Sequence, residues 1–122
     1  MDTTEVYIKM CDCSEIQGGR NATEMDWDWS DYYYKDGFVG RYDPHENFRI
    51  LPAIWLPDQS QLQEMIEDEP RGQLFRLYHF ALENDNIIEL RNVFQFTSME
   101  QLWLAFVMKE LHNKTWNGDK WE

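Results

Sequence analysis

The strongest hydrophobic pattern lies between residues 98 and 112, where apolar side chains recur at the three- and four-residue spacing of a helix. Ser98 and Gln101 predict a capping box, in which the side chain of each residue accepts a hydrogen bond from the other's backbone amide. Further apolar residues widen the stripe, so we expect this helix to lie at the centre of the core. The stripe comprises Met99, Leu102, Trp103, Phe106, Val107 and Leu111, and Leu104, Ala105 and Met108 widen it.

Two more helices are predicted before this one. Asp58 is a favourable N-cap for a helix that begins near Gln59 and is closed by Pro70. Residues 72–83 repeat apolar positions at helical spacing and predict another amphipathic helix. The inner faces are expected to carry Leu62, Met65 and Ile66 in the first helix and Leu74, Leu77, Tyr78, Ala81 and Leu82 in the second.

The N-terminal segment shows the alternation that is typical of a half-buried strand. Val6, Ile8 and Met10 fall on one side of residues 5–10, and polar or amphipathic residues fall on the other. We therefore expect a first strand here. A loop should follow over residues 14–25, which contain two adjacent glycines and a polar run.

Further strands are predicted in the middle of the chain. Residues 29–35 and 38–42 are rich in aromatics, and the Asp-Gly pair at 36–37 predicts a hairpin turn between them. Residues 48–50 alternate between apolar and polar positions, which favours another extended segment. Residues 53–56 lie between two prolines, so we expect them at a sheet edge or in a loop that plugs the core.

The end of the chain predicts a hairpin, because an Asn-Gly pair at 117–118 lies between Trp116 and Trp121. A length of 122 residues suits one domain with one core. The predicted fold class is α+β: a single small domain, residues 1–122. A mostly antiparallel sheet from the N-terminal half packs on about three helices from the C-terminal half, with a short C-terminal hairpin.

The charge balance restricts the class of partner. The formal net charge is −12, from 23 acidic and 11 basic residues. Direct binding to nucleic acid is disfavoured, because that affinity comes largely from Lys and Arg neutralising phosphates, and anionic membrane surfaces are disfavoured for the same reason. An acidic surface is compatible with a basic protein partner, and in the extreme with imitation of DNA. It also simply favours solubility.

The sequence predicts a soluble, cytoplasmic protein. The longest apolar run, LWLAFVM, is far shorter than the ~20 residues that span a bilayer. The N-terminus lacks the basic start and long apolar run of a signal peptide. Cys11 and Cys13 are too close together for an ordinary disulfide, which indicates a reducing compartment.

Candidate chemistry is sparse. Cys11, Asp12 and Cys13 offer donors for zinc or copper, yet a stable site wants about four ligands. The histidines His45, His79 and His112 show no ligand spacing with them. Both cysteines are equally compatible with small apolar positions on one face of a strand end. We therefore predict no metal and no cofactor.

Acid-base chemistry has two weak candidates. Asp43, His45 and Glu46 are expected together on a turn, where they suit either proton transfer or a solvated loop. Asp26 and Asp28 would project from one side of a strand, as a glycosidase pair could. Acidic pairs are too frequent in this chain for that pattern to discriminate, so no catalytic residue is predicted.

The segment EMDWDWSDYYY, residues 24–34, places five large aromatics among four acidic residues. One extended face cannot bury all these rings, so some are expected at the surface. Trp and Tyr are enriched in binding hot spots because they bring large rigid area with a polar group. Alternatively, the rings form a second layer of core, or stack on a sugar. The candidate contact residues are Asp26, Trp27, Asp28, Trp29, Asp31, Tyr32, Tyr33 and Tyr34.

Four segments carry a family resemblance: KMCDCSEIQ from Lys9, IWLPDQSQLQEMI from Ile54, SMEQLWLAFVMKE from Ser98 and WNGDKW from Trp116. In this order they resemble segments of small uncharacterised phage and prophage proteins of Gram-positive bacteria. They cover under half of the chain. The resemblance implies a viral or mobile-element origin and no known activity. The chain departs from the family after the first segment, where Gly-Gly leads into the acidic, aromatic stretch instead of a Trp-Pro and Gly-Asp pattern.

The leading hypothesis is a phage-encoded accessory protein in the cytoplasm of the bacterial host. It would bind a host or phage protein through its acidic and aromatic surface, with which a basic partner is compatible. One alternative is an inhibitor that mimics DNA and occupies a host DNA-binding enzyme. Another is a small hydrolase or carbohydrate-binding protein, which would need a deep pocket with two convergent titratable groups.

Overall fold

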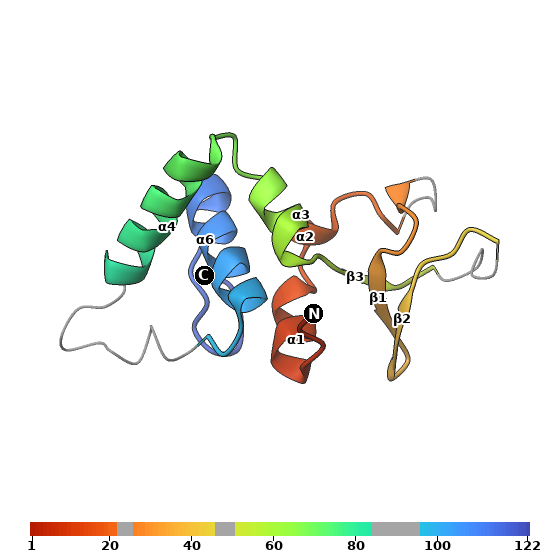
Figure 1. Ribbon diagram of the computed structural model, residues 1–122. Coiled ribbons are helices and arrows are strands. Elements are labelled where there is room, and N and C mark those ends of the chain that lie inside the picture. The colour runs from red at the N-terminus through yellow and green to blue at the C-terminus, as the bar shows by residue number, and fades with distance from the viewer. Residues whose placement is uncertain (22–25, 46–50, 84–95) are drawn as a thin grey trace.

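The structure, a computed structural model, describes residues 1–21, 26–45, 51–83 and 96–122 (Figure 1). This part contains a three-stranded antiparallel sheet and five helices, so the predicted α+β class is confirmed. The helices gather on one side and the sheet lies on the other (Figure 1). In chain order the elements are α1 (Glu5–Cys11), α2 (Ser14–Gln17), β1 (Tyr32–Lys35), β2 (Phe38–Arg41), β3 (Ile54–Leu56), α3 (Gln59–Glu64), α4 (Pro70–Glu83) and α6 (Met99–His112).

The sheet is built around β1, which pairs with β2 on one side and with β3 on the other. Both pairings are antiparallel, and Tyr33 lies opposite Gly40 of β2 and Trp55 of β3. Asp36 and Gly37 have φ angles of 51° and 85°, as a type I′ turn requires. The predicted hairpin is therefore confirmed. The segment predicted between the two prolines does form a strand at a sheet edge.

The predicted first strand is wrong, because this segment forms the helix α1. Thr4 caps the helix: its side-chain oxygen accepts a hydrogen bond from the Tyr7 amide at 3.3 Å. Tyr7, Met10 and Cys11 are buried on one helical face, whereas Val6 is exposed. The apolar residues of this segment fit both the two-residue period of a strand and the 3.6-residue period of a helix. Packing of the face that carries Tyr7 into the core selects the helix.

The helical turn α2 lies in the segment that was predicted as a loop, and it holds the sheet against the helices. The Gln17 side chain is buried; its Nε2 donates to the carbonyl oxygens of Cys11 and Trp55, at 2.8 and 2.9 Å. Its Oε1 accepts from the Trp55 amide at 2.8 Å. Asn21 Oδ1 accepts from the Ala53 amide at 3.0 Å. These two side chains thus cover the outer edge of β3 as a further strand would.

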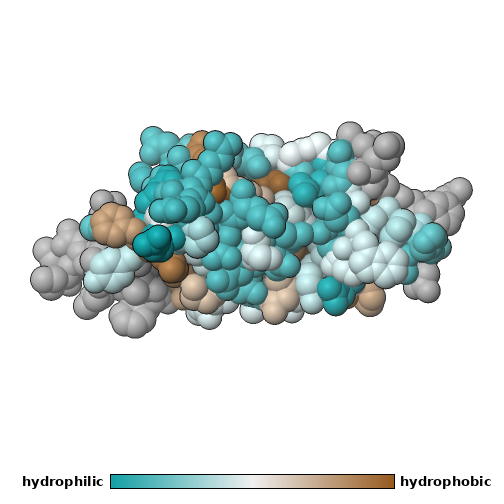
Figure 2. Space-filling view, turned by 45° about the horizontal axis from the view of Figure 1, so that its top comes forward, coloured by the Kyte–Doolittle hydropathy of each residue, from teal (hydrophilic) through white to brown (hydrophobic). Residues whose placement is uncertain are grey.

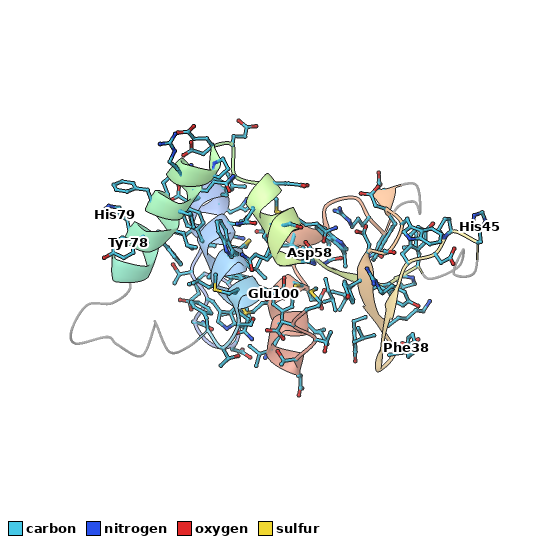
Figure 3. The ribbon with its side chains drawn as sticks, in the orientation of Figure 1. Phe38, His45, Asp58, Tyr78, His79 and Glu100 are labelled. Atoms are coloured by element: carbon cyan, nitrogen blue, oxygen red, sulfur yellow. The ribbon has the colours of Figure 1, made fainter. Side chains whose placement is uncertain are left out.

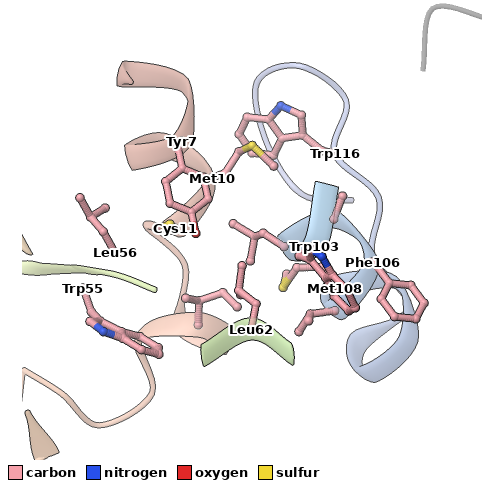
Figure 4. Close-up of a cluster of buried hydrophobic side chains, with 14 of the residues drawn as sticks. Tyr7, Met10, Cys11, Trp55, Leu56, Leu62, Trp103, Phe106, Met108 and Trp116 are labelled. Atoms are coloured by element: carbon pink, nitrogen blue, oxygen red, sulfur yellow. The ribbon is translucent and has the colours of Figure 1, made fainter. Parts of the chain in front are cut away.

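The helix α6 lies at the centre of the core, as predicted, and contacts α1, α3 and α4. Trp103, Phe106 and Met108 are fully buried on it; Trp103 and Met108 lie beside Leu62 of α3, and Phe106 lies on their far side (Figure 4). The middle of the predicted stripe is buried, together with the residues that widen it, but its two ends are not: Met99 and Leu111 remain 47 % and 50 % exposed.

The capping box predicted at the start of α6 is only half formed. Ser98 Oγ accepts from the Gln101 amide at 3.1 Å, but Gln101 Oε1 accepts from the Thr97 amide, also at 3.1 Å. The buried Gln101 side chain instead donates through Nε2 to the Asp2 carboxylate at 2.9 Å. That carboxylate also accepts from the Ser98 hydroxyl and from Thr4. Asp2 therefore ties the N-terminal segment to the start of α6.

The helix α3 begins with the predicted cap, since Asp58 and Gln61 form a complete capping box. Its inner face carries the buried Leu62, while Ile66, which was predicted on the same face, is buried just beyond the end of the helix. Pro70 was predicted to close this helix, but α3 ends at Glu64 and Pro70 is the first residue of α4. Proline is favourable there, because the first turn of a helix leaves its amides without intrahelical acceptors.

The inner face of α4 differs from the predicted one. Leu77 and Phe80 are buried, and the Phe80 ring lies 5.5 Å from that of Phe106 on α6. Leu74 and Tyr78, predicted to face inward, are 61 % and 62 % exposed. Three predicted positions lie outside the described residues: the side chains of Ala81 and Leu82, and the segment 48–50.

The predicted C-terminal hairpin is confirmed. Trp116 and Trp121 form an antiparallel bridge, and Gly118 has a φ of 99° in the turn between them. The two indole rings lie 5.1 Å apart. Trp121 Nε1 donates to the Met10 carbonyl oxygen at 2.9 Å, so the hairpin is held against α1.

We expect Gln17→Ala to lower the free energy of unfolding by about 2–4 kcal/mol, because the Trp55 amide and carbonyl lose their buried partner. Urea denaturation followed by circular dichroism measures the change. Gln63→Ala, at a half-buried position of α3, is the matched control and should change stability by less than about 0.5 kcal/mol. Equal effects of the two substitutions would show that the Gln17 amide is not a structural partner of β3.

Asp2 should make stability depend on acid pH. Burial acts to raise the pKa of Asp2, but hydrogen bonds from Ser98, Thr4 and Gln101 outweigh it, so the folded pKa lies below the ordinary value of 3.8. The stabilisation is therefore present above the unfolded pKa and is lost as the pH falls through the folded one.

We expect Asp2→Asn to lower the free energy of unfolding by about 1–3 kcal/mol at neutral pH. This difference from the wild type should shrink below about pH 4, where the carboxylate becomes protonated. Urea midpoints measured from neutral to acid pH test this. A difference that stays constant across that range would contradict the role of the ionised carboxylate.

Candidate interaction surface

The loop that leads into β1, residues 26–31, holds most of the predicted contact residues; we call it the Trp29 loop. The structure divides the predicted set by burial. Trp29 is 65 % exposed, and Asp26 and Asp28 beside it are also exposed. The buried members are Trp27, Asp31 and Tyr33, and the half-buried members are Tyr32 and Tyr34.

Asp31 anchors the Trp29 loop from within. It is only 4 % exposed, and its Oδ2 accepts from the Asp28 amide at 2.9 Å. Its Oδ1 accepts from Gln61 Nε2 on α3 at 2.7 Å. Ser30 adds a second anchor, because its amide donates to the Tyr42 carbonyl at 2.7 Å while its backbone is left-handed, with φ of 68°. The loop is thus held at several points, and Trp29 extends from it into solvent.

Trp27 and Tyr33 belong to the core of the sheet. Their rings are 6.5 Å apart in an edge-to-face arrangement, and Trp27 lies 6.0 Å from Tyr42. The indole Nε1 of Trp27 donates to the Arg20 carbonyl oxygen at 2.9 Å, so its polar group is satisfied. These side chains support the Trp29 loop and do not form its exposed surface.

Tyr32 and Tyr34 lie on the opposite face of the sheet from Tyr33, as alternate strand residues do. The Arg41 guanidinium carbon lies 4.8 Å from the centre of the Tyr32 ring, and its Nε donates to the Ser30 carbonyl at 3.4 Å. This face is half-buried and adjoins the Trp29 loop at its Ser30 end. It extends the candidate surface beyond Trp29.

Phe38 is an exposed ring that the sequence argument did not single out. It is 61 % exposed at the turn end of the hairpin, and its ring lies 6.3 Å from that of Tyr33 (Figure 3). Gly40 makes room for both rings, because a Cβ there would lie 2.7 Å from the Tyr33 hydroxyl and 2.8 Å from the Phe38 ring. Phe38 lies at the opposite end of the hairpin from the Trp29 loop, so it is not among the candidate contact residues.

A groove of about 470 Å³ lies between the C-terminal hairpin and the junction of α1 and α2. Two ion pairs, Lys114 with Glu15 and Lys9 with Asp119, hold its walls together. The hydrogen bond from Lys114 lowers the pKa of Glu15 to about 2, and the one from Lys9 lowers the pKa of Asp119. Both carboxylates are ionised at neutral pH, so neither is suited to act there as a general acid.

The two cysteines sit in different surroundings. Cys11 is fully buried in α1, and burial raises the pKa of its thiol well above the ordinary value. Cys13 is half-buried beside the groove, where burial also raises its pKa. Protonated thiols are weak nucleophiles and weak metal ligands. Within the described ranges, no three His, Cys, Asp or Glu side chains are grouped so as to hold a metal ion.

Asp43 and His45 serve the local turn. The Asp43 carboxylate accepts a hydrogen bond from the His45 backbone amide at 2.8 Å, and the His45 side chain is exposed at the far end of the sheet (Figure 3). Glu46, the third member of the predicted trio, lies outside the described residues. The described pair therefore has the geometry of an Asx turn.

Exposed carboxylates occur on α1, in the Trp29 loop, on α3 and α6, and in the C-terminal hairpin. The densest run is at residues 64–69, around the turn from α3 to α4. None of the described helices is both long enough and apolar enough to span a bilayer.

Comparison with known proteins gives no match for this chain: no protein-family model, curated protein sequence or solved structure matches it. What the protein does must therefore be inferred from its own residues. Among these residues, the Trp29 loop combines an exposed Trp side chain with a backbone that Asp31 and Ser30 hold in place.

We expect Asp31→Ala to release the Trp29 loop, because the substitution removes its hydrogen bonds to the Asp28 amide and to Gln61. Amide hydrogen exchange over residues 26–31 should accelerate about tenfold or more, and the free energy of unfolding should fall by about 1–3 kcal/mol. Asp26→Ala, at an exposed position of the same loop, should leave both quantities nearly unchanged. Unchanged exchange in Asp31→Ala would show that the carboxylate does not hold the loop.

Proposed function

We propose that this chain is a phage-encoded accessory protein of the bacterial cytoplasm that acts by binding a basic protein of the host or the phage. The exposure of Trp29 is the observation that carries the proposal. Single exposed apolar residues are ordinary, but a Trp that is 65 % exposed on an anchored loop belongs to the residue type most enriched in binding hot spots.

The anchoring of the Trp29 loop supports a binding role. Association costs free energy when loops and side chains must be ordered on contact. Here Asp31 and Ser30 already hold the backbone through hydrogen bonds to Gln61 and Tyr42. Much of that ordering cost is thus met during folding, and the indole is presented in a preformed position.

The charge around Trp29 indicates the class of partner. Asp26 and Asp28 are exposed in the same loop, before Trp29 in the chain, and the whole chain has a formal net charge of −12. Such a surface accelerates encounter with a basic protein and disfavours acidic ones. A positively charged patch with an apolar recess for one indole ring is the expected counterpart.

The phage origin in this proposal rests on the four segments that resemble phage and prophage proteins. Those segments lie in α1 and α2, in β3 and α3, in α6 and in the C-terminal hairpin. They form the packed scaffold, while the Trp29 loop lies in the stretch where the resemblance ends. This division suits a shared scaffold that presents a binding loop particular to this chain.

We expect Trp29→Ala to abolish partner binding without unfolding the protein. Immobilised wild type is exposed to lysate of a Gram-positive bacterium, with and without phage infection, and retained proteins are quantified by mass spectrometry. The immobilised Trp29→Ala variant should retain at least about tenfold less of the basic protein than the wild type does. A tenfold loss corresponds to about 1.4 kcal/mol of binding free energy, which a hot-spot residue supplies. Phe38→Ala, an exposed ring at the turn end of the same hairpin, is the matched control and should retain the partner fully.

Three outcomes would contradict the proposal. The first is that the wild type retains no protein above a blank matrix in either lysate. The second is that Trp29→Ala retains the same proteins in the same amounts, and the third is that Phe38→Ala loses them equally. Circular dichroism and urea midpoints of both variants establish that they are folded, which the exposure of both rings leads us to expect.

A further inference from the structure

The helix α4 carries two apolar faces, and only one of them is covered in the part of the chain that the structure describes. Leu77 and Phe80 form the covered face against α6. Leu74, Phe75 and Tyr78 are 61 %, 65 % and 62 % exposed. At 100° per residue, Phe75 points about opposite to the covered face, Tyr78 about 130° from it and Leu74 at about a right angle to it. They form a second stripe, with spacings of one, three and four residues; we call it the α4 stripe.

The α4 stripe is more than scattered surface apolarity. Exposed apolar residues are ordinary when they are single, but contiguous patches of large side chains mark interaction sites. The rings also contact each other through His79, which lies 4.4 Å from Phe75 and 6.1 Å from Tyr78. Tyr78 and His79 point away from α6 (Figure 3). In the space-filling view, apolar side chains lie at the surface over the α4 end, among hydrophilic ones (Figure 2).

The charges next to the α4 stripe are strongly acidic. Glu67, Asp68 and Glu69 are exposed in the turn that leads into α4, and Glu64 is exposed at the end of α3. Asp68 has an ion-pair partner in Arg76, at 3.7 Å. Of the cations on α4, Arg71 lies on the exposed side and Arg76 also pairs with Glu110. The surface around the N-terminal end of the α4 stripe therefore carries a net negative charge.

We propose that the α4 stripe is a docking surface for a basic amphipathic helix of a partner protein. An apolar helical face that uses Leu74, Phe75 and Tyr78 accepts the apolar side of a second helix at the usual three- and four-residue spacing. Lys or Arg residues that flank the apolar side of that helix would meet Glu67 and Glu69. The partner thus matches the surface in both shape and charge.

Charge also favours a basic helix over two other occupants of the α4 stripe, a second copy of the chain and a membrane surface. A second copy of the chain would bring another net charge of −12 to the same surface, and like charges oppose that association. An anionic membrane surface would be repelled by the acidic turn for the same reason. A basic helix alone gains from both the apolar stripe and the carboxylates.

This surface is separate from the Trp29 loop. The helix α4 lies at one end of the molecule, and the sheet with its loop lies at the other (Figure 1). One small partner helix cannot reach both. The two surfaces can therefore be tested independently. A negative result for the α4 stripe does not contradict the proposal for the Trp29 loop, and the converse also holds.

The test uses a fluorescein-labelled synthetic peptide of about 18 residues, five helical turns, built from Leu and Lys with Leu at helical spacing. Fluorescence anisotropy at physiological salt gives its Kd for the full chain. We expect Phe75→Ser and Leu74→Ser to weaken binding about tenfold or more, and Glu67→Gln with Glu69→Gln to weaken it severalfold and reduce its salt dependence. Phe38→Ser, an equally exposed ring on the sheet, should bind as the wild type does.

Several results would overturn the proposal. They are failure of the wild type to bind the peptide, equal binding of a peptide with the same composition in scrambled order, and equal weakening by Phe38→Ser and Phe75→Ser. Sedimentation equilibrium tests the second-copy occupant: a wild-type dimer that Phe75→Ser dissociates would assign the stripe to self-association. Flotation with neutral phosphatidylcholine vesicles tests the membrane occupant, and co-flotation that Phe75→Ser abolishes would assign the stripe to lipid.

Discussion

The hydrogen bonds of one buried side-chain amide, that of Gln17, join the two halves of this fold. The sheet reaches the helices through β3, and Gln17 satisfies both the amide and the carbonyl of Trp55 at the edge of that strand. The same amide donates to Cys11 at the end of α1. The outer edge of β3 is thereby closed without a fourth strand, and the sheet is held in one orientation on the helical core.

The two candidate surfaces follow from this arrangement. The helices pack around α6, so the outer side of α4 is left uncovered in the described part of the chain, while the sheet places the Trp29 loop at the other end. Neither surface contributes to the core between them. A small domain with large exposed apolar side chains at both ends has the geometry to contact two different molecules, as the two proposals together imply. The core fixes the distance and orientation between the two ends.

Local signals in the sequence predicted the elements that depend on few residues. The Asp58 cap, the Asp-Gly turn and the Asn-Gly hairpin were all found, because each is decided by a few neighbouring residues. The first helix and the face of α4 were missed, since burial of Tyr7 and Phe80 against distant partners decides them. Residue type marked the aromatic stretch around Trp29. Which of its rings face solvent depends on Asp31 and Gln61, thirty positions apart in the chain.

The contacts of the first helix bear on how the protein folds. The Asp2 carboxylate is bound by Gln101 and the Met10 carbonyl oxygen by Trp121, so part of the surroundings of α1 comes from residues about a hundred positions further along the chain. The rest comes from nearer residues, because α1 also packs against β3 and the Tyr7 hydroxyl donates to the Pro57 carbonyl oxygen. Contacts of such long sequence separation slow folding, since a long loop must close before they form. The formal net charge of −12 opposes association between chains that have not yet closed these contacts.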